Sequence, residues 1–288
     1  MKKCIIIMNP ESGKVKSLDT KNEFYDALRK HGYDAEIRYT KGPKDATKIA
    51  RKYFFSKNII YSVGGDGTLN EVVNGLVGSK NILGVIPAGS GNDFYKSLKE
   101  LTEPYPVIDL GKINDHYFIN IVSIGIDAEV SDNVNLLKSK VNPDNVYNAS
   151  LIYTFFKYKS PSISFSIDEK ESFGKCTILT VCNGKVYGGG FKIAPNASLT
   201  DGYFDVYYVE KLTKSKILFL ISKLRKGTHE SSKKVHKSNA TKIKFACDNE
   251  LVCNVDGETI RAKKFSIKIV PHALTIYNDK DLINKFLS

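Results

Sequence analysis

The chain has 288 residues, which as a prior suggests two domains, and its 42% apolar content is ordinary for a globular protein with a substantial core. The formal net charge of +12 suggests a polyanionic partner, either nucleic acid or an anionic membrane, although a generally basic proteome would also explain it. The five cysteines form no C-x-x-C pair and no apolar run approaches the ~18 residues of a membrane span, so we expect reduced thiols and a cytoplasmic protein.

The first third of the sequence alternates between apolar strands and amphipathic helices. Strands this apolar are typical of a parallel sheet buried on both faces. We therefore predict an N-terminal doubly wound, mostly parallel α/β domain over residues 1–125 that binds nucleotide. Whether the tail 275–288 returns to it is left open. The predicted strands cover residues 4–10, 34–40, 58–64 and 82–89, and the predicted helices 20–32, 45–54, 69–78 and 92–98.

From residue 107 the pattern changes to short strands rich in β-branched and aromatic residues. Such spacing indicates antiparallel pairing in a sandwich or barrel. We predict a C-terminal antiparallel β-sandwich-like domain over residues 126–274. Two helical stretches interrupt it, at 148–157 and 214–226.

The stretch YSVGGDGTLNEVVNG contains a glycine-rich turn between a buried strand and a helix. Gly64, Gly65 and Gly67 lack side chains, so backbone N–H groups there can approach a phosphate at the helix N-terminus. Asp66 cannot face a phosphate without a cation between them, because the two negative charges repel. Its presence implies Mg²⁺ held by carboxylate, water and phosphate oxygens. The alternative is a tight turn in which Asp66 only caps the helix.

Two further polar loops leave predicted parallel strands at the same edge. IPAGSGNDF is a second glycine-rich strand-to-helix turn and carries Asp93, while NPESGK follows the first strand. Loops at the carboxyl ends of such strands converge where open α/β sheets bind ligands. NPESGK is not a Walker A loop, because Met8 and Val15 stand where that motif needs glycine and a hydroxyl residue.

The run GGDGTLNEVVNGL followed by PAGSGNDF resembles the diacylglycerol kinase catalytic family, which includes bacterial soluble diacylglycerol kinases and YegS-type lipid kinases. Residues 191–206 and 255–258 resemble that family's second-domain segment and late acidic motif. G-G-D-G-T also occurs in NAD kinases and phosphofructokinases, but the continuation and the P-A-G-S-G-N-D turn point to the lipid branch. The resemblance implies an ATP- and Mg²⁺-dependent kinase that phosphorylates a membrane lipid hydroxyl, with diacylglycerol the expected acceptor and phosphatidic acid the product.

The resemblance also implies where ATP would bind. One departure is Ser90-Gly91, where threonine and a larger residue are usual; the hydroxyl remains. Together with the glycine-loop argument, the predicted nucleotide-binding residues are Asn9, Pro10, Glu11, Ser12, Gly13, Thr40, Gly64, Gly65, Asp66, Gly67, Thr68, Leu69, Asn70, Glu71, Ser90 and Asp93.

Metal and catalytic residues follow from the same resemblance. Asp66, Asp93 and Asp127 match acidic residues that organise Mg²⁺ near the phosphates. The Asp201 side chain, with the carbonyls of Ser198 and Tyr203, matches a second, structural Mg²⁺ site. Glu258 matches the general base, is expected to be partly buried, and acts with Asp66 in catalysis. Without the resemblance, Asp201-Gly202 and Asp256-Gly257 are ordinary turn pairs and Glu258 an exposed strand residue.

Residues 211–237 concentrate lysine and arginine, with Glu230 as the one acid in the stretch. Apolar residues recur at helical spacing between 217 and 224, which predicts a basic amphipathic helix. Its apolar face either lies on an anionic membrane or packs on the second domain's sheet. Of the whole stretch, the loop 227–237 is the better candidate for direct membrane contact.

We therefore expect a cytoplasmic lipid kinase associated peripherally with an anionic membrane. No nucleic-acid partner is expected, and a homodimer is left open. The enzymatic alternative is an NAD kinase, which shares the Gly-Gly-Asp loop but has a soluble acceptor. The alternative from another class is a basic nucleic-acid-binding regulator, for which the sequence offers charge but no recognised motif.

Overall fold

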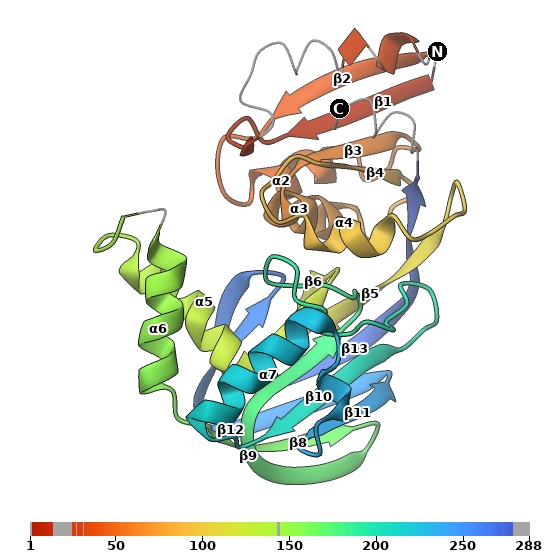
Figure 1. The fold of residues 1–288 in the computed structure, drawn as a ribbon. Coiled ribbons are helices and arrows are strands. Elements are labelled where there is room, and N and C mark those ends of the chain that lie inside the picture. The colour runs from red at the N-terminus through yellow and green to blue at the C-terminus, as the bar shows by residue number, and fades with distance from the viewer. Residues whose placement is uncertain (1, 14–24, 27, 31, 143–144, 279–288) are drawn as a thin grey trace. The chain divides into compact units, whose positions relative to one another are not determined.

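The computed structural model describes residues 2–13, 25–26, 28–30, 32–142 and 145–278 (Figure 1). The chain divides into two compact units. The first combines Met1–Leu110 with Leu199–Asp201 and Val270–Ser288, and the second combines Gly111–Ser198 with Gly202–Ile269. In the described ranges, no helix is both long enough and apolar enough to cross a membrane.

The first unit is built on a parallel sheet. Strand β1 (Lys2–Met8) pairs with β2 (Tyr33–Tyr39) on one side and β3 (Ile59–Gly64) on the other, and β4 (Ile82–Pro87) follows β3. The C-terminal end of the long strand β13 (Glu258–Tyr277) pairs in parallel with β4 through Ile276 and Tyr277. Most of the tail 275–288 lies outside the described residues.

Burial on both faces explains why β1 is uniformly apolar from Cys4 to Met8. Ile5, Ile6 and Ile7 are fully buried although successive side chains point to opposite faces of the sheet. Short helices follow the other strands: α2 (Asp45–Lys52), α3 (Asp66–Leu76) and α4 (Asp93–Leu98). Most of the predicted helix 20–32 falls outside the described residues, although 25–26 and 28–30 are helical.

The second unit is antiparallel throughout its described strand pairs. Its strands are the end of β5 (Val107–Ile113), β6 (His116–Phe118), β7 (Ile121–Gly125), β8 (Ser162–Ile167), β9 (Lys170–Cys182), β10 (Phe204–Glu210), β11 (Val235–Ala240), β12 (Lys242–Val255) and the first part of β13. The long strands β9 and β12 each pair with β8 along their first half and with β7 along their second. Strands β9 and β12 therefore connect β8 to β7 around one core.

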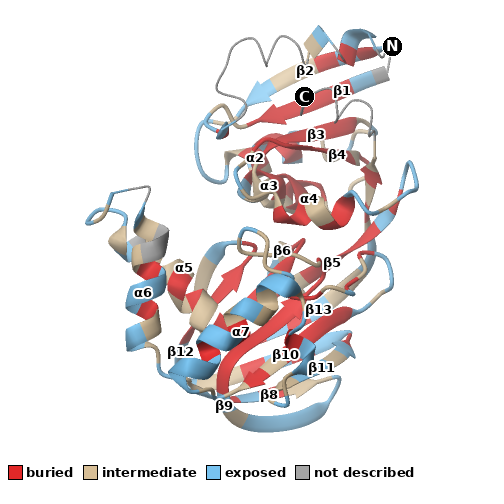
Figure 2. Cartoon of the chain, in the orientation of Figure 1, coloured by how far each residue is buried: buried red, intermediate tan, exposed pale blue. Residues whose placement is uncertain are grey.

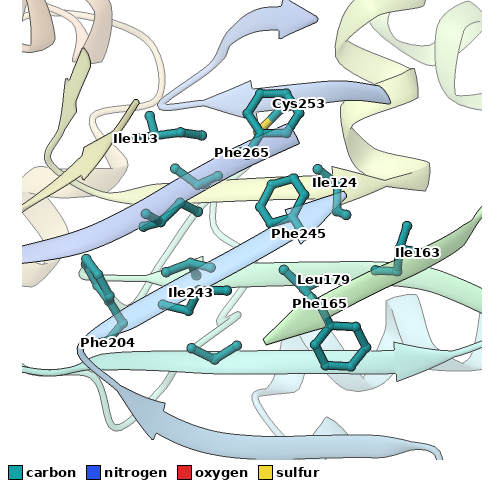
Figure 3. Packing of buried hydrophobic residues seen from close by; sticks show 14 of the residues in the cluster. Ile113, Ile124, Ile163, Phe165, Leu179, Phe204, Ile243, Phe245, Cys253 and Phe265 are labelled. Atoms are coloured by element: carbon teal, nitrogen blue, oxygen red, sulfur yellow. The ribbon is translucent and has the colours of Figure 1, made fainter. Parts of the chain in front are cut away.

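Aromatic side chains fill that core (Figure 3). Phe245 lies opposite Phe165 on one neighbouring strand and opposite Phe265 on the other. All three are buried, and the Phe245 and Phe265 ring centroids lie 4.9 Å apart. Such cross-strand aromatic pairs fix the register of β8, β12 and β13.

Three helices accompany these strands: α5 (Ile126–Leu137), α6 (Val146–Lys157) and α7 (Lys214–Lys226). The last two agree with the helices predicted at 148–157 and 214–226. Helix α5 was not predicted, because Ile126 looks like the end of an apolar strand. Gly125 makes the turn possible: its φ is +110°, and a Cβ there would lie 2.4 Å from the carbonyl oxygen of Thr177.

Asp256 does more than close the β12–β13 hairpin. Its carboxylate accepts backbone N–H groups from Ile119, Asn120 and Ile121 at 2.7, 3.0 and 2.9 Å. Asp256 and Gly257 both have positive φ, as a two-residue hairpin turn of this type requires. The turn that precedes Glu258 is therefore fixed to the start of β7.

Candidate active site

The two glycine-rich turns of the first unit touch through their backbones. A Cβ on Gly89 would lie 2.5 Å from the Cα of Gly65, so a side chain at Gly89 would force the turns apart. Gly64 is also constrained, because a Cβ there would lie 2.6 Å from Thr68 Oγ1. Gly89 was absent from the predicted site. Its signal in the sequence is its place in the glycine-rich segment between a strand and a helix, as for Gly65.

Helix α3 begins inside the motif, at Asp66 and not at Leu69 as predicted. Its N-cap is Gly65, which has no side chain to cover the N–H groups of the first turn. These N–H groups and the helix dipole favour an anion at this end of the helix. The turn is thus a helix N-terminus suited to phosphate, as the glycine-loop argument expects.

Asp66 joins this turn to the next one. Its carboxylate accepts the backbone N–H of Asp93 at 3.1 Å and of Phe94 at 3.4 Å, both in the first turn of α4. Burial raises the pKa of Asp66 above its ordinary value and the nearby Asp93 carboxylate adds to the rise, while the two N–H groups oppose it. The predicted proximity to a second carboxylate is therefore present, but Asp66 caps α4 and not α3, the helix that the capping alternative expected.

Asp93 is buried, and its Oδ1 lies 2.7 Å from Lys96 Nζ one turn along α4. Asn92 holds the preceding turn closed: its side chain accepts the Gly89 N–H at 3.1 Å and donates to the Gly89 carbonyl at 2.7 Å. Asn92 stands at φ 49°, a conformation that asparagine tolerates better than most residues. Lys96 and Asn92 were not predicted, although their contacts with Asp93 and Gly89 are local, each between residues three apart in the chain.

The loop after β1 lies beside the first glycine-rich turn. Asn9 Nδ2 donates to Thr68 Oγ1 at 3.3 Å, and the Asn9 side-chain oxygen accepts the Glu11 N–H at 3.0 Å. Thr40 lies at the neighbouring strand end, where its N–H donates to the Met8 carbonyl at 2.9 Å. The structure thus brings together the predicted residues that follow β1, β2, β3 and β4.

Glu71 has a different position from the one its predicted ATP contact suggests. Its carboxylate accepts the N–H groups of Lys44 at 2.7 Å and Ala46 at 3.0 Å, at the start of α2. It therefore caps α2, as carboxylates at helix N-termini commonly do. Ser90 is exposed, and Ser12 is buried.

Could this site hold Mg²⁺? In the described residues no three His, Cys, Asp or Glu side chains lie close enough to form a metal site by themselves. Asp66 and Asp93 offer two carboxylates, and Mg²⁺ commonly takes one or two carboxylates with phosphate and water oxygens completing its shell. The residues present therefore fit a metal that arrives with a nucleotide.

The predicted catalytic residue Glu258 belongs to the second unit. It pairs with Val255 at the start of β13, next to the turn that Asp256 fixes. The partial burial expected of it is not found, because Glu258 is exposed. An anchored turn beside an exposed carboxylate gives that carboxylate a defined position with access to an acceptor.

Asp127, also in the second unit, lies in the first turn of α5 and accepts a short hydrogen bond from Ser123 Oγ. The residue as a whole is half-buried, but its Oδ1 is buried and has no hydrogen-bond partner within the described structure. Burial raises the pKa of Asp127 to about 6, although the Ser123 hydrogen bond opposes the rise. A buried carboxylate oxygen without a partner is suited to a cation or a proton.

Ser198, Asp201 and Tyr203 lie on one short turn. Asp201 and Tyr203 are exposed, Ser198 is half-buried, and Gly202 has φ 77°. This geometry agrees with the alternative in which Asp201-Gly202 is an ordinary turn pair. A carboxylate and backbone carbonyls on one turn are also hard oxygen ligands of the kind Mg²⁺ takes.

The basic stretch is more structured than expected. Ile217 and Leu220 of α7 are buried, and Leu220 packs with Ile178 and Val209, so the apolar face lies on the sheet. The stretch 227–237, expected to be a loop, contains the 3₁₀ turn His229–Ser231 and the start of β11. Lys237 Nζ lies 2.7 Å from the buried Asp205 carboxylate, and Lys234 Nζ lies 2.9 Å from Glu210.

Comparison with known proteins agrees with this arrangement. Residues 3–117 match the diacylglycerol kinase catalytic domain, and residues 120–278 match the YegS C-terminal NAD kinase beta sandwich-like domain. A diacylglycerol kinase of Staphylococcus saprophyticus is 32% identical over 89% of this chain and 89% of its own length. One from Staphylococcus aureus is 31% identical over 99% of this chain and 95% of its own.

Solved structures show the same fold. A putative diacylglycerol kinase from Bacillus anthracis superposes with a TM-score of 0.78 at 22% identity, covering 98% of this chain and 96% of that one. A second structure under that description gives 0.76 at 23% identity, covering 98% of both chains.

These matches define a two-domain kinase that phosphorylates an alcohol acceptor, with an α/β catalytic domain followed by a β-sandwich-like domain. The chain belongs to the diacylglycerol kinase family. The resemblance to the diacylglycerol kinase family and the predicted class of enzyme, a kinase that phosphorylates an alcohol, are therefore confirmed.

The buried Asp127 carboxylate predicts a pH dependence of stability in metal-free buffer. Its folded pKa of about 6 lies above the ~3.9 of an unfolded chain, so ionisation destabilises the fold as pH rises from about 4 to 6. Asp127→Asn should therefore raise the free energy of unfolding by about 2 kcal/mol at pH 8 and leave it unchanged near pH 4. Denaturant unfolding of both proteins at the two pH values, with chelator present, measures this. An equal effect at both values would show that Asp127 ionises as easily in the folded protein as in the unfolded one.

Proposed function

We propose that this chain transfers the γ-phosphate of ATP to the hydroxyl of diacylglycerol and produces phosphatidic acid, with Mg²⁺ required. The observation that carries the proposal is the contact between the two glycine-rich turns, which puts the open N-terminus of α3 beside the Asp66 and Asp93 carboxylates. Anion-binding N–H groups next to two acidic side chains suit a metal-bound nucleotide better than a bare phosphate. The diacylglycerol kinase names of relatives at 30–32% identity support the acceptor.

In the proposed reaction the first unit binds ATP and the second supplies the acceptor. Glu258 accepts the proton of the lipid hydroxyl, whose oxygen attacks the γ-phosphorus as ADP leaves. The N–H groups of the first turn of α3 stabilise charge on the transferred phosphoryl group. Asp66 and Asp93 would hold Mg²⁺, which would neutralise phosphate charge.

The test is phosphate transfer from labelled ATP, with diacylglycerol in phospholipid vesicles and NAD offered separately. We expect labelled phosphatidic acid, identified by mass, and no labelled NADP. Asp66→Asn should reduce turnover at least about a hundredfold, because it removes charge while keeping an acceptor for the α4 N–H groups. Glu258→Gln should lower kcat with little change in KM for ATP. Labelled NADP without labelled lipid would establish the NAD kinase alternative and refute the proposed acceptor.

We further propose a structural Mg²⁺ at Asp201, bound by its carboxylate and by the Ser198 and Tyr203 carbonyls. A metal that binds only the folded chain raises its melting temperature by mass action. Chelator should therefore lower the melting temperature of the wild type but not that of Asp201→Ala. Identical melting of the wild type with and without chelator would remove this site.

A further inference from the structure

Helix α6 has its polar and apolar faces reversed with respect to water. Ser150 and Thr154 are 0% and 1% exposed, and Thr154 Oγ1 accepts a hydrogen bond from Asn133 of α5 at 2.8 Å. On the same helix Phe156 is 73% exposed and Ile152 58% exposed. Figure 2 shows that α6 has both buried and exposed residues along its length. A helix in water buries apolar residues and exposes polar ones, so the exposed side of α6 is suited to an apolar environment.

The neighbouring end of α7 continues this apolar exposure. Lys214 Nζ donates to the carbonyls of Phe155 and Tyr158, which fixes the start of α7 at the end of α6. Leu218 follows Lys214 by four residues, so it lies on the same side of α7 one turn further along. Leu218 is 57% exposed and Phe219 64% exposed.

Positive charge surrounds these side chains. Lys157 and Lys159 are exposed at the end of α6, and Lys216 is exposed on α7. Neither helix contains Asp or Glu. Lys223 Nζ lies 4.9 Å from the centre of the Phe219 ring, so a cation sits directly beside an exposed aromatic residue. An apolar centre with a cationic border is complementary to an anionic lipid surface, where apolar side chains enter the acyl boundary and lysines remain at the phosphates.

We propose that Ile152, Tyr153, Phe156, Leu218 and Phe219, here called the α6–α7 surface, insert into the surface of an anionic phospholipid bilayer. The proposal rests on the proposed function, because a membrane acceptor requires the enzyme to reach the bilayer. It places the contact on apolar side chains and not on the stretch 227–237. There Lys234 and Lys237 already pair with Glu210 and Asp205, so their charges are partly neutralised within the fold.

The chain contains no tryptophan, so one introduced tryptophan reports a single position. Phe156→Trp and Phe219→Trp place the reporter on the α6–α7 surface. Phe55→Trp is the matched control, because Phe55 is 98% exposed and lies outside the α6–α7 surface. Vesicles of equimolar phosphatidylglycerol and phosphatidylcholine should shift the emission of the first two variants to the blue, and brominated acyl chains should quench it. The control should show neither change, nor should any variant with pure phosphatidylcholine.

A second pair of variants measures the energetic contribution. Phe156→Ser with Phe219→Ser should weaken sedimentation with the anionic vesicles by about tenfold or more, from the lost burial of two aromatic side chains. Phe55→Ser with Phe173→Ser removes two exposed phenylalanines elsewhere and should leave binding unchanged. Equal melting temperatures establish that each variant is folded. Activity on a short-chain dispersed diacylglycerol should be unchanged in both pairs.

Three results would overturn the proposal. In the first, the protein binds anionic vesicles while tryptophan at 156 and 219 stays exposed. In the second, a blue shift grows with protein concentration in the absence of lipid, which would assign the surface to a second copy of the chain. In the third, both serine pairs bind equally well. None of the binding measurements needs ATP or turnover, so a failure here is distinguishable from a failure of the proposed kinase activity.

Discussion

The site in the first unit depends on the close backbone contact between Gly65 and Gly89. Because a Cβ on Gly89 would lie 2.5 Å from the Cα of Gly65, the second turn cannot carry a side chain at that point without displacing the first, and the N-termini of α3 and α4 are held together. Asp66 then serves both: it lies in the first turn of one helix and accepts N–H groups from the other. A carboxylate in this position would oppose phosphate binding by itself. We propose a cation as the third component beside the buried Asp66 and Asp93, and this proposal connects the glycine motif to kinase chemistry.

Much of this site could be predicted because it depends on local sequence. The apolar strands, the glycines that follow them and the acidic residue in each turn are all visible along the chain. Parallel strands bring their carboxyl ends to one edge, which is why residues as distant as Asn9 and Thr68 could be expected to meet. The start of α3 was misplaced by three residues, because glycine and aspartate usually signal a turn and here form the first turn of a helix.

Other features depend on tertiary contacts and left no readable pattern. Helix α5 follows an apolar strand without a break, and only the crowding at Gly125 shows why the chain must turn there. Asp256 looked like an ordinary turn residue, and its three N–H partners lie more than 130 residues away in the chain. The role of Glu71 as a cap for α2 was hidden for the same reason. In the basic stretch, the pairing of Lys234 with Glu210 and of Lys237 with Asp205 also depends on the fold and could not be read from the sequence.

The second unit contains an anchored hairpin that carries Glu258 and a helix, α6, whose apolar side is exposed. The aromatic core and the Asp256 anchor fix the hairpin that carries Glu258. The reversed polarity of α6 costs stability in water, since apolar side chains are left exposed while hydroxyl groups are buried. Such an arrangement is consistent with the proposed insertion of the α6–α7 surface into a lipid bilayer.

The measurement that tests the central account most directly is calorimetric binding of ATP to the wild type and to Asp66→Asn, with Mg²⁺ and with chelator. If a cation must lie between Asp66 and the phosphates, Mg²⁺ should strengthen ATP binding to the wild type. The variant should bind metal-free ATP more tightly than the wild type does, because the repelling charge is gone, and should gain less from Mg²⁺. Equal wild-type affinity with and without Mg²⁺, together with equal weakening of both forms by the substitution, would contradict the account and leave Asp66 only as a cap for α4.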